Sequence, residues 1–227
     1  MASFVIPPLE STSLPVSGGG LFPVRRVFCV GQNYADHARE MGSDPDRQPP
    51  FFFTKPADAI TTADKVPYPS LTQRLDYEGE LVVAIGKTAS NIAADQALDH
   101  VYGYAAGCDL TRRDMQAEAK KAGRPWDMAK GFDQSGVCSE IHPAATIGHP
   151  SQGRIGLSVN GEVRQDGNLN QMIWSIPEII ASLSRYVTLQ PGDLIYTGTP
   201  AGVGPLAKGD AVQVFIDGVA SLSFSIL

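Results

Sequence analysis

The stretch EGELVVAIGKTASNIAADQALDHVYGYAAGCD, residues 78–109, contains two apolar segments on either side of a helix-like one. The first, 78–85, combines polar/apolar alternation with β-branched residues, and the last, 101–109, is rich in small and apolar residues. Both patterns are typical of short buried strands, whereas 89–100 has the composition of a short helix. This stretch therefore predicts two strands that flank a helix.

Similar signals continue toward the N-terminus. Residues 27–30 form an apolar run that ends at a glycine, and 33–42 contain helix formers closed by a second glycine, which predicts a strand, a turn and a helix. The three phenylalanines at 51–53 are too few for a helix and predict a buried strand. Residues 1–24 carry four prolines and three consecutive glycines, which predict an extended arm or short edge hairpin outside a main domain of residues 25–227.

Toward the C-terminus the pattern predicts more short elements. A helix is expected after residue 110, with Thr111 as its N-cap and Gly123 as its end, and another at 175–186. The dipeptides Asn-Gly at 160–161 and Asp-Gly at 217–218 lie between alternating segments and predict two-residue hairpin turns. Eight or more short strands and three or four short helices, without regular βαβ alternation, indicate a β-rich α+β fold.

Composition and charge exclude several classes of protein. The 227 residues are 43% hydrophobic and 19% charged, which excludes a mainly disordered chain. With 18 Lys and Arg against 24 Asp and Glu the net charge is −6, so the chain lacks the basic excess that nucleic-acid binding requires. Its three cysteines show no disulfide or zinc pattern, and no stretch approaches the roughly 18 apolar residues of a membrane span. We expect a cytoplasmic protein with no nucleic-acid or membrane partner.

Three carboxylates are candidates for a metal site. Glu78 and Glu80 flank Gly79 at the start of a predicted strand, so both side chains point to the same face. Such a pair is stable in water, with a shared proton, or around a cation. Asp109 ends the second strand and can project beside the pair, and three carboxylates favour Mg²⁺ or Mn²⁺. A solvated strand end for the pair, and a helix cap for Asp109, are the alternatives.

Other residues suggest acid–base chemistry and anion binding. His37 and Glu40 are three apart in a predicted helix, so the carboxylate can hold the imidazole as a general base; an exposed pair on a surface helix is the alternative. Lys130 follows the segment PWDMA. The Gly/Thr loop at 197–204 could bind a carboxylate or enolate oxygen through its backbone N–H groups, although by itself it is compatible with an ordinary turn. The remaining histidines are expected to be structural or exposed.

Seven segments together resemble the fumarylacetoacetate hydrolase family, and more closely its short acylpyruvate-hydrolase branch. They occur here in the family's order: VGQNYADHAREMG (30–42), FFFTKPADAI (51–60), LDYEGELVVAIGK (75–87), GYAAGCDLTRRDMQ (103–116), GRPWDMAKGFD (123–133), LSVNGEVRQ (157–165) and YTGTPAGVGP (196–205). The resemblance runs from about residue 27 to the C-terminus. Agreement across seven ordered segments is too extensive to arise by chance.

The resemblance implies a mixed β-sandwich roll, usually a homodimer, with one Mg²⁺ or Mn²⁺ per subunit. The family's metal ligands fall on Glu78, Glu80 and Asp109, and its catalytic residues on His37, Glu40 and Lys130. Its substrate-contacting residues fall on Gln116 and Thr199, and we expect Gly198 of the same loop, Phe53 and Arg25 to contact the substrate as well. Relatives commonly have arginine where this chain has Gln32, so the far end of the substrate can differ here. A second carboxylate on the substrate would need a cation, for which the candidates are Arg25, Lys55 and Arg124.

The resemblance also implies a reaction. Members of this branch cleave the C3–C4 bond of a 2,4-dioxo acid to give pyruvate and a carboxylic acid, and the motifs look most like those of members that act on fumarylpyruvate in the gentisate route of aromatic degradation. Oxaloacetate decarboxylation and isomerisation of hydroxymuconate-type acids are alternatives that use the same metal and enolate chemistry. A non-catalytic binding protein is the alternative from another class.

Overall fold

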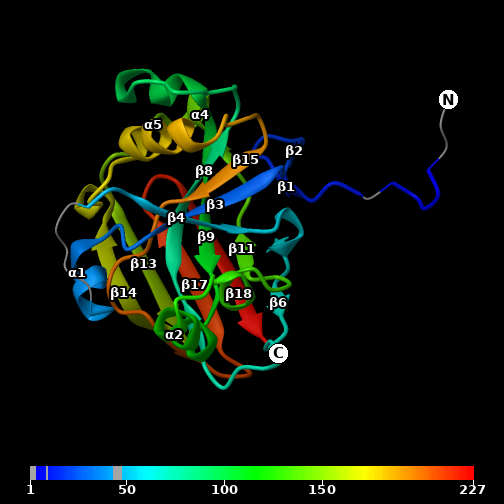
Figure 1. Ribbon diagram of the computed structural model, residues 1–227, viewed down its shortest axis with the longest axis vertical. Coiled ribbons are helices and arrows are strands. Elements are labelled where there is room, and N and C mark those ends of the chain that lie inside the picture. The colour runs from blue at the N-terminus through cyan, green and yellow to red at the C-terminus, as the bar shows by residue number, and fades with distance from the viewer. Residues whose placement is uncertain (1–3, 9, 43–47) are drawn as a thin grey trace.

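The computed structural model describes residues 4–8, 10–42 and 48–227, and its body is a stack of two β-sheets with short helices at the ends (Figure 1). The central, mixed sheet contains in spatial order β4 (Phe51–Lys55), β3 (Arg26–Gly31), β15 (Asp193–Tyr196), β8 (Gly79–Ile85), β9 (Val101–Asp109), β11 (Gly136–Cys138) and β5 (Ile60–Thr61), with β12 (His142–Pro143) paired to β9. The neighbours β3 and β15 are parallel, whereas β8 is antiparallel to both β15 and β9.

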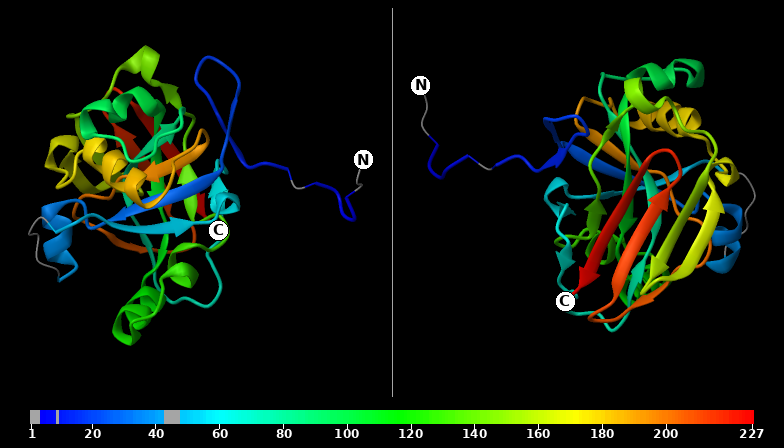
Figure 2. Two further views of the ribbon diagram at one scale, coloured as in Figure 1. Left: turned by 45° about the horizontal axis from the view of Figure 1, so that its top comes forward. Right: turned by 180° about the vertical axis from the view of Figure 1, so that it is seen from behind.

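The second sheet lies behind the central sheet in Figure 1 and faces the viewer in the right-hand view of Figure 2. Its strands in spatial order are β14 (Glu162–Asn168), β13 (Arg154–Val159), β17 (Ala211–Ile216), β18 (Ala220–Ile226) and β6 (Lys65–Val66). A three-stranded sheet consists of β10 (Thr111–Arg112), β7 (Leu75–Tyr77) and β16 (Gly204–Leu206), and a hairpin of β1 (Ser13–Pro15) and β2 (Leu21–Pro23). The described residues therefore form the β-rich α+β fold that the sequence predicts.

The helices are short and lie outside the two large sheets. The α-helices are α1 (Ala35–Glu40), α2 (Arg113–Ala122), α3 (Asp127–Lys130), α4 (Ala144–Ile147) and α5 (Ile176–Tyr186), and the 3₁₀ helices are Ala57–Ala59, Ala94–His100 and Leu169–Gln171. The helix α5 packs against the 3₁₀ helix Ala94–His100. None of the helices in the described part of the chain has both the length and the apolar character that a membrane span requires.

The central strand β8 has hydrophobic cores on both faces. Because side chains alternate along a strand, Leu81, Val83 and Ile85 enter the core between the two large sheets, whereas Val82 and Ala84 enter a second core on the other face. This arrangement explains why 81–85 is continuously apolar, as expected for a strand covered on both sides.

The N-terminal hairpin closes the second core. Leu14 of β1 and Phe22 of β2 are buried there against residues of the central sheet. The predicted edge hairpin is therefore confirmed, and its burial shows that the packed body includes residues from about Ser13 onward. The described residues before the hairpin extend away from the body (Figure 1).

Two predicted turns can be compared with the structure. The Asn-Gly hairpin is confirmed: Asn160 and Gly161 have φ values of +53° and +83°, as a tight turn between β13 and β14 requires. The Asp-Gly hairpin differs, because Ile216 pairs with Ala220 and leaves a three-residue loop, 217–219. The loop is longer because Val219 turns inward and is buried in the core.

Two other local predictions need correction. Thr111 does not cap a helix but lies in β10, paired with Asp76, and α2 begins at Arg113. Gly123 ends α2 as predicted, in the left-handed conformation with φ of +62°. The strand at 51–53 exists, but its side chains are exposed or half-buried because β4 is the edge strand of the central sheet.

Candidate active site

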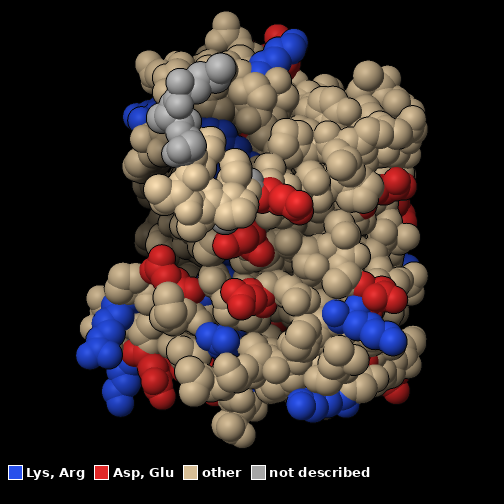
Figure 3. All heavy atoms as spheres, turned by 90° about the vertical axis from the view of Figure 1, so that its right-hand side faces the viewer, with Lys and Arg blue, Asp and Glu red and all other residues tan. Residues whose placement is uncertain are grey.

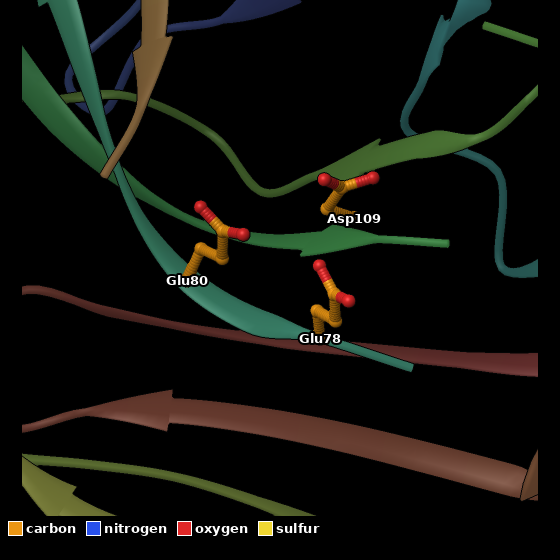
Figure 4. A group of neighbouring side chains, drawn as sticks. All are labelled: Glu78, Glu80 and Asp109. Carbon is orange, nitrogen blue, oxygen red and sulfur yellow. The ribbon is translucent and has the colours of Figure 1, made fainter. Parts of the chain in front are cut away.

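Glu78, Glu80 and Asp109 converge on one face of the central sheet, as Figure 4 shows. In the register of β8 with β9, Glu80 lies opposite Gly107, and the Asp109 N–H donates to the Glu78 carbonyl at 2.8 Å. The three carboxylates are buried, and one ligand oxygen from each lies within 4.8 Å of the others. A Cβ at Gly107 would lie 2.6 Å from the Tyr196 ring, so glycine is required where β9 passes this cluster.

Three cations surround these carboxylates. The Lys130 ammonium donates to Glu78 Oε2 at 2.7 Å and to Asp109 Oδ2 at 2.8 Å. Arg113 Nη2 donates to Glu78 Oε1 at 2.5 Å. Lys55 Nζ lies 2.8 Å from Asp109 Oδ1 and also donates to the backbone carbonyl of Lys130. Glu80 differs from the other two carboxylates because no described residue forms an ion pair with it.

The surroundings shift the two glutamates in opposite directions. Burial disfavours the charged form of Glu78, but the nearby charges of Lys130 and Arg113 outweigh burial and hold the pKa of this carboxyl well below its usual range. Burial, together with the charges of Asp109 and Glu78, raises the pKa of Glu80 well above its usual range. Glu80 is thus the carboxylate whose charge most lacks compensation by the protein.

The cluster fits a divalent metal ion. Among the described residues, Glu80 accepts one hydrogen bond, from the Gly198 N–H at 2.7 Å, and Asp109 Oδ1 forms an ion pair with Lys55 but no hydrogen bond of good geometry. A buried set of carboxylate oxygens suits Mg²⁺ or Mn²⁺ rather than a metal that prefers nitrogen or sulfur. The alternative that Glu78 and Glu80 form a solvated strand end is therefore wrong, because both are buried. The alternative that Asp109 caps a helix is also wrong, because Asp109 lies outside α2.

His37 and Glu40 form the predicted pair on α1. His37 Nδ1 lies 3.2 Å from Glu40 Oε2, and the imidazole is buried. Glu40 also accepts the backbone N–H of Gly202 at 3.2 Å, which ties α1 to the Gly/Thr loop. The exposed pair on a surface helix is therefore wrong, since His37 lines the same cavity as Glu78.

The Gly/Thr loop continues β15 alongside β8. Gly198 has φ of +98°, a conformation suited to glycine, and a Cβ there would lie 2.7 Å from Asn33 Cβ. Its N–H donates to Glu80, and the N–H of Gly202 donates to Glu40. These two N–H groups therefore hold site carboxylates in place, and binding of a substrate anion by the loop stays a prediction.

A buried glutamine connects this loop to the carboxylate cluster. Gln165 of β14 accepts the Gly79 N–H at 2.9 Å and donates to Thr199 Oγ1 at 2.8 Å and to Pro200 O at 2.7 Å. Thr199 in turn donates to the carbonyl of Gly79 at 2.8 Å. Gln165 therefore fixes the backbone between the two glutamates relative to the loop.

Seven of the predicted site residues line one small cavity of about 30 Å³: His37, Phe53, Glu78, Glu80, Gln116, Lys130 and Thr199. Gln116 is held by Arg113 Nη1, which donates to its Oε1 at 2.6 Å. The Lys130 ammonium lies 5.1 Å from the Phe53 ring centroid. These contacts join strands, loop and helices around a single site.

The candidates for a second substrate carboxylate lie in different places. Arg25 lies before β3 and pairs with Asp193 at 3.2 Å; about 20 Å of strand separates it from the end of β3 at the cavity. Arg25 is therefore not among the described residues that line the cavity, and its contact with substrate stays a prediction. Lys55 is buried against Asp109 behind the carboxylates. Arg124 lines a second cavity next to the first.

Sequence reasoning did not identify Arg113, Gln165 or Asn33 as site residues. Asn33 Nδ2 donates to the carbonyl of Thr197 at 2.8 Å, and Arg113 bridges Glu78 and Gln116. No local pattern distinguishes these residues, since their partners are brought close by the tertiary fold. The available signal was that all three lie within or next to the motifs of the resemblance.

Comparison with known proteins places this site in a known class. Residues 26–226 match the family described as Fumarylacetoacetate (FAA) hydrolase C-terminal, so the chain belongs to the fumarylacetoacetate hydrolase family. It is 48% identical to a fumarylpyruvate hydrolase from Ralstonia sp over 78% of this chain and 92% of that protein.

Two further relatives are informative. The crystal structure of fumarylpyruvate hydrolase from Pseudomonas aeruginosa in complex with Mn²⁺ and pyruvate is 47% identical, covers 99% of both chains and superposes with a TM-score of 0.97. A mitochondrial oxaloacetate tautomerase from Mus musculus is 44% identical over 89% of this chain and 91% of that protein. The family resemblance of the sequence is thus confirmed.

Proposed function

We propose that this chain is a metal-dependent hydrolase that cleaves the C3–C4 bond of an acylpyruvate, with fumarylpyruvate as its substrate and pyruvate and fumarate as products. The observation that carries the proposal is the convergence of three buried carboxylates and the His37–Glu40 pair on one cavity. The relatives named fumarylpyruvate hydrolase, one of them in complex with Mn²⁺ and pyruvate, support it.

Glu78, Glu80 and Asp109 hold the divalent cation in this proposal. When bound, the cation acts as a Lewis acid toward the oxygen atoms of a 2-oxo acid. The protein prepares the site by holding Glu78 and Asp109 with the Lys130 ammonium and Glu80 with the Gly198 N–H. In this proposal Gly198 positions a metal ligand, Glu80, through its backbone N–H.

His37 acts as the general base. If its Nδ1–H donates to the Glu40 carboxylate, Nε2 is the nitrogen left to accept a proton. His37 removes a proton from the water that attacks the C4 carbonyl, and Glu40 orients the ring and stabilises its charged form. The hydrogen bond from Gly202 to Glu40 holds the carboxylate in this orientation.

Bond breaking then follows from the tetrahedral C4. The water oxygen has formed a new C–O bond to C4, and the C3–C4 bond breaks with its electron pair going to the pyruvate fragment as an enolate. The proton held by His37 returns to C3, which gives pyruvate and a carboxylic acid. Two of the three N–H groups of Lys130 bind carboxylates, and we assign the third to a substrate oxygen, with Gln116 and Thr199 as further polar contacts and Phe53 as an apolar wall.

The test follows pyruvate release from fumarylpyruvate by metal-stripped protein with and without added Mn²⁺. We expect cleavage to depend on the metal and to fall about 100- to 10,000-fold in His37→Ala, the usual contribution of a general base. His142→Ala is the matched control. His142 also pairs with a glutamate, Glu140, at 3.5 Å, but this pair lies outside the cavity. Equal loss in both variants, or none in either, contradicts the proposal.

A second candidate is tautomerisation of oxaloacetate, supported by the 44% identical mitochondrial relative. It moves a proton between carbon and oxygen and needs no attacking water. Oxaloacetate is therefore included in the same assay, followed by the absorbance of its enol and by pyruvate formation. Faster turnover of oxaloacetate than of fumarylpyruvate without pyruvate formation favours the tautomerase. Faster turnover of oxaloacetate with accumulation of pyruvate favours the decarboxylase.

We also propose that the protein is a cytoplasmic homodimer with its catalytic domain beginning near Ser13. The apolar side chains of Phe4, Val5 and Ile6 are largely exposed on the extended arm, which supports burial against a second copy. The three cysteines are unpaired and buried, as in proteins of a reducing compartment. Analytical ultracentrifugation of the wild type and of a variant with serine at these three arm positions tests the dimer: a monomeric wild type contradicts it.

A further inference from the structure

A second cavity, of about 570 Å³, adjoins the small cavity of the active site. Phe53, Lys120 and Trp126 line both cavities. The second cavity lies between β4 and the segment that runs from the end of α2 into α3. A ligand anchored at the carboxylate cluster can therefore extend into it past these shared side chains.

The size of the inner cavity makes such an extension necessary. About 30 Å³ accommodates only a small group beside the carboxylates. The pyruvyl end of an acylpyruvate occupies that position in the proposed function, so the acyl chain must leave it. Phe53 and Trp126 lie at the boundary of the two cavities in edge-to-face contact, with ring centroids 5.7 Å apart, so the acyl chain must pass beside this pair of rings.

The wall of the second cavity is aromatic and suits a planar, unsaturated chain. Phe51 packs edge-to-face on Trp126 with ring centroids 5.1 Å apart, and Phe51 lies 6.2 Å from Phe53. Aromatic clusters of this kind provide a rigid surface for a flat apolar segment. They provide no partner for a charged end group.

Lys120 and Arg124 supply the positive charge in this cavity. Neither side chain has an ion pair or hydrogen bond within the part of the chain that the structure describes. The backbone of Arg124 is held in the turn that Gly123 makes after α2, because its backbone N–H donates to Ala119 O at 2.9 Å, and its exposed side chain lines the cavity. Asp127 is the acidic residue of the lining, so the two cations leave a net charge of about +1 for an anionic ligand.

We propose that this second cavity is the subsite for the distal carboxylate of the substrate, with Arg124 as its main partner and Lys120 beside it. The subsite makes the protein selective for acylpyruvates whose acyl chain ends in a carboxylate. The inference rests on the proposed function for the position of the pyruvyl end. It also ranks the cations considered from the sequence, since Arg25 and Lys55 pair with Asp193 and Asp109.

The test compares two substrates that differ in one group. Crotonylpyruvate has the acyl chain of fumarylpyruvate with a methyl group in place of the distal carboxylate. We expect wild-type protein to prefer fumarylpyruvate in kcat/KM, and Arg124→Met to lower that preference about tenfold, mainly through KM, as loss of a charge-assisted hydrogen bond predicts. Arg124→Lys restores part of the preference. Lys121→Met is the control, because Lys121 lies next to Lys120 but lines neither cavity.

An unchanged preference in Arg124→Met overturns the subsite, as does an equal change in the Lys121→Met control. If the wild type cleaves neither substrate, the proposed function is refuted. Calorimetric titration of the Mg²⁺-loaded protein with fumarate and with crotonate then tests, without turnover, whether the subsite binds a distal carboxylate. Tighter binding of fumarate that is lost in Arg124→Met supports the subsite. Equal affinities for the two acids in wild type and variant overturn it.

Discussion

Gln165 is the residue whose replacement most directly tests how the site is held together. Its side chain is fully buried on β14 and makes three hydrogen bonds, to Gly79, Thr199 and Pro200. Leucine has a similar size but no polar atoms. In Gln165→Leu the Gly79 N–H and the Pro200 carbonyl lose these partners, whereas Thr199 keeps its bond to the Gly79 carbonyl.

The expected cost follows from those two groups. Each buried group left without a partner costs about 1–3 kcal/mol, so Gln165→Leu should lower the free energy of unfolding by about 2–6 kcal/mol. Activity should fall as well, because Gly79 lies between Glu78 and Glu80. Guanidinium unfolding followed by tryptophan fluorescence measures the first effect, and pyruvate release measures the second.

The matched control is Gln213→Leu. Gln213 also lies on a strand of the second sheet, but its side chain is exposed, so we expect a change within about 0.5 kcal/mol. If Gln165→Leu also stays within that range of the wild type, the reasoning that Gln165 joins the loop to the carboxylate strand is refuted.

Three further predictions concern other parts of the site and core. Gly107→Ala places a Cβ 2.6 Å from the Tyr196 ring, so thermal unfolding should show about 1–3 kcal/mol of destabilisation, and an unchanged midpoint would contradict the close approach. Arg113→Met leaves two buried carboxylates without this partner and should cost about 3–5 kcal/mol by guanidinium unfolding; Arg164→Met, at an exposed pair, is the control and should cost less than about 1 kcal/mol. Burial raises the pKa of Cys138 to about 12, so a thiol reagent at pH 8 should react with the native protein far more slowly than with unfolded protein, and equal rates would show that the thiols are accessible.

The strands and the carboxylate cluster could be predicted because they depend on local rules. The two-residue period of a strand places Glu78 and Glu80 on one face, and the end of the next apolar segment marks Asp109. The Asn-Gly turn and the glycine that ends α2 are also local signals. The position of His37 beside the cluster came from the family resemblance rather than from spacing.

The remaining features depend on contacts between residues distant in sequence. Gln165 meets Gly79 from 86 positions away, and nothing in the segment EVRQ distinguishes it from a surface residue. Threonine is a common helix N-cap residue, and Thr111 precedes a helical pattern, but the pairing of β10 with β7 determines its conformation. Arg25 is near the motifs in sequence, yet it lies at the opposite end of β3 from the site.

On the face shown in Figure 3, acidic side chains lie mainly near the middle and basic ones mainly toward the margins. The acidic excess of the chain contrasts with the charge balance at the site, where Lys55, Lys130 and Arg113 offset the three carboxylates. A bound divalent cation adds to that local charge and favours an anionic substrate.

The central claim is that Glu78, Glu80 and Asp109 bind one divalent cation on which carbon–carbon bond cleavage depends. The most direct measurement is a titration of metal-stripped protein with Mn²⁺, in which electron paramagnetic resonance reports bound metal and pyruvate release from fumarylpyruvate is followed in the same samples. We predict that activity rises in proportion to bound Mn²⁺ and reaches its maximum at one ion per chain. Glu80→Gln should weaken both Mn²⁺ binding and pyruvate release, whereas Glu140→Gln, at an exposed glutamate, should change neither quantity. Full activity without metal, or Mn²⁺ binding that Glu80→Gln leaves unaffected, would contradict the claim.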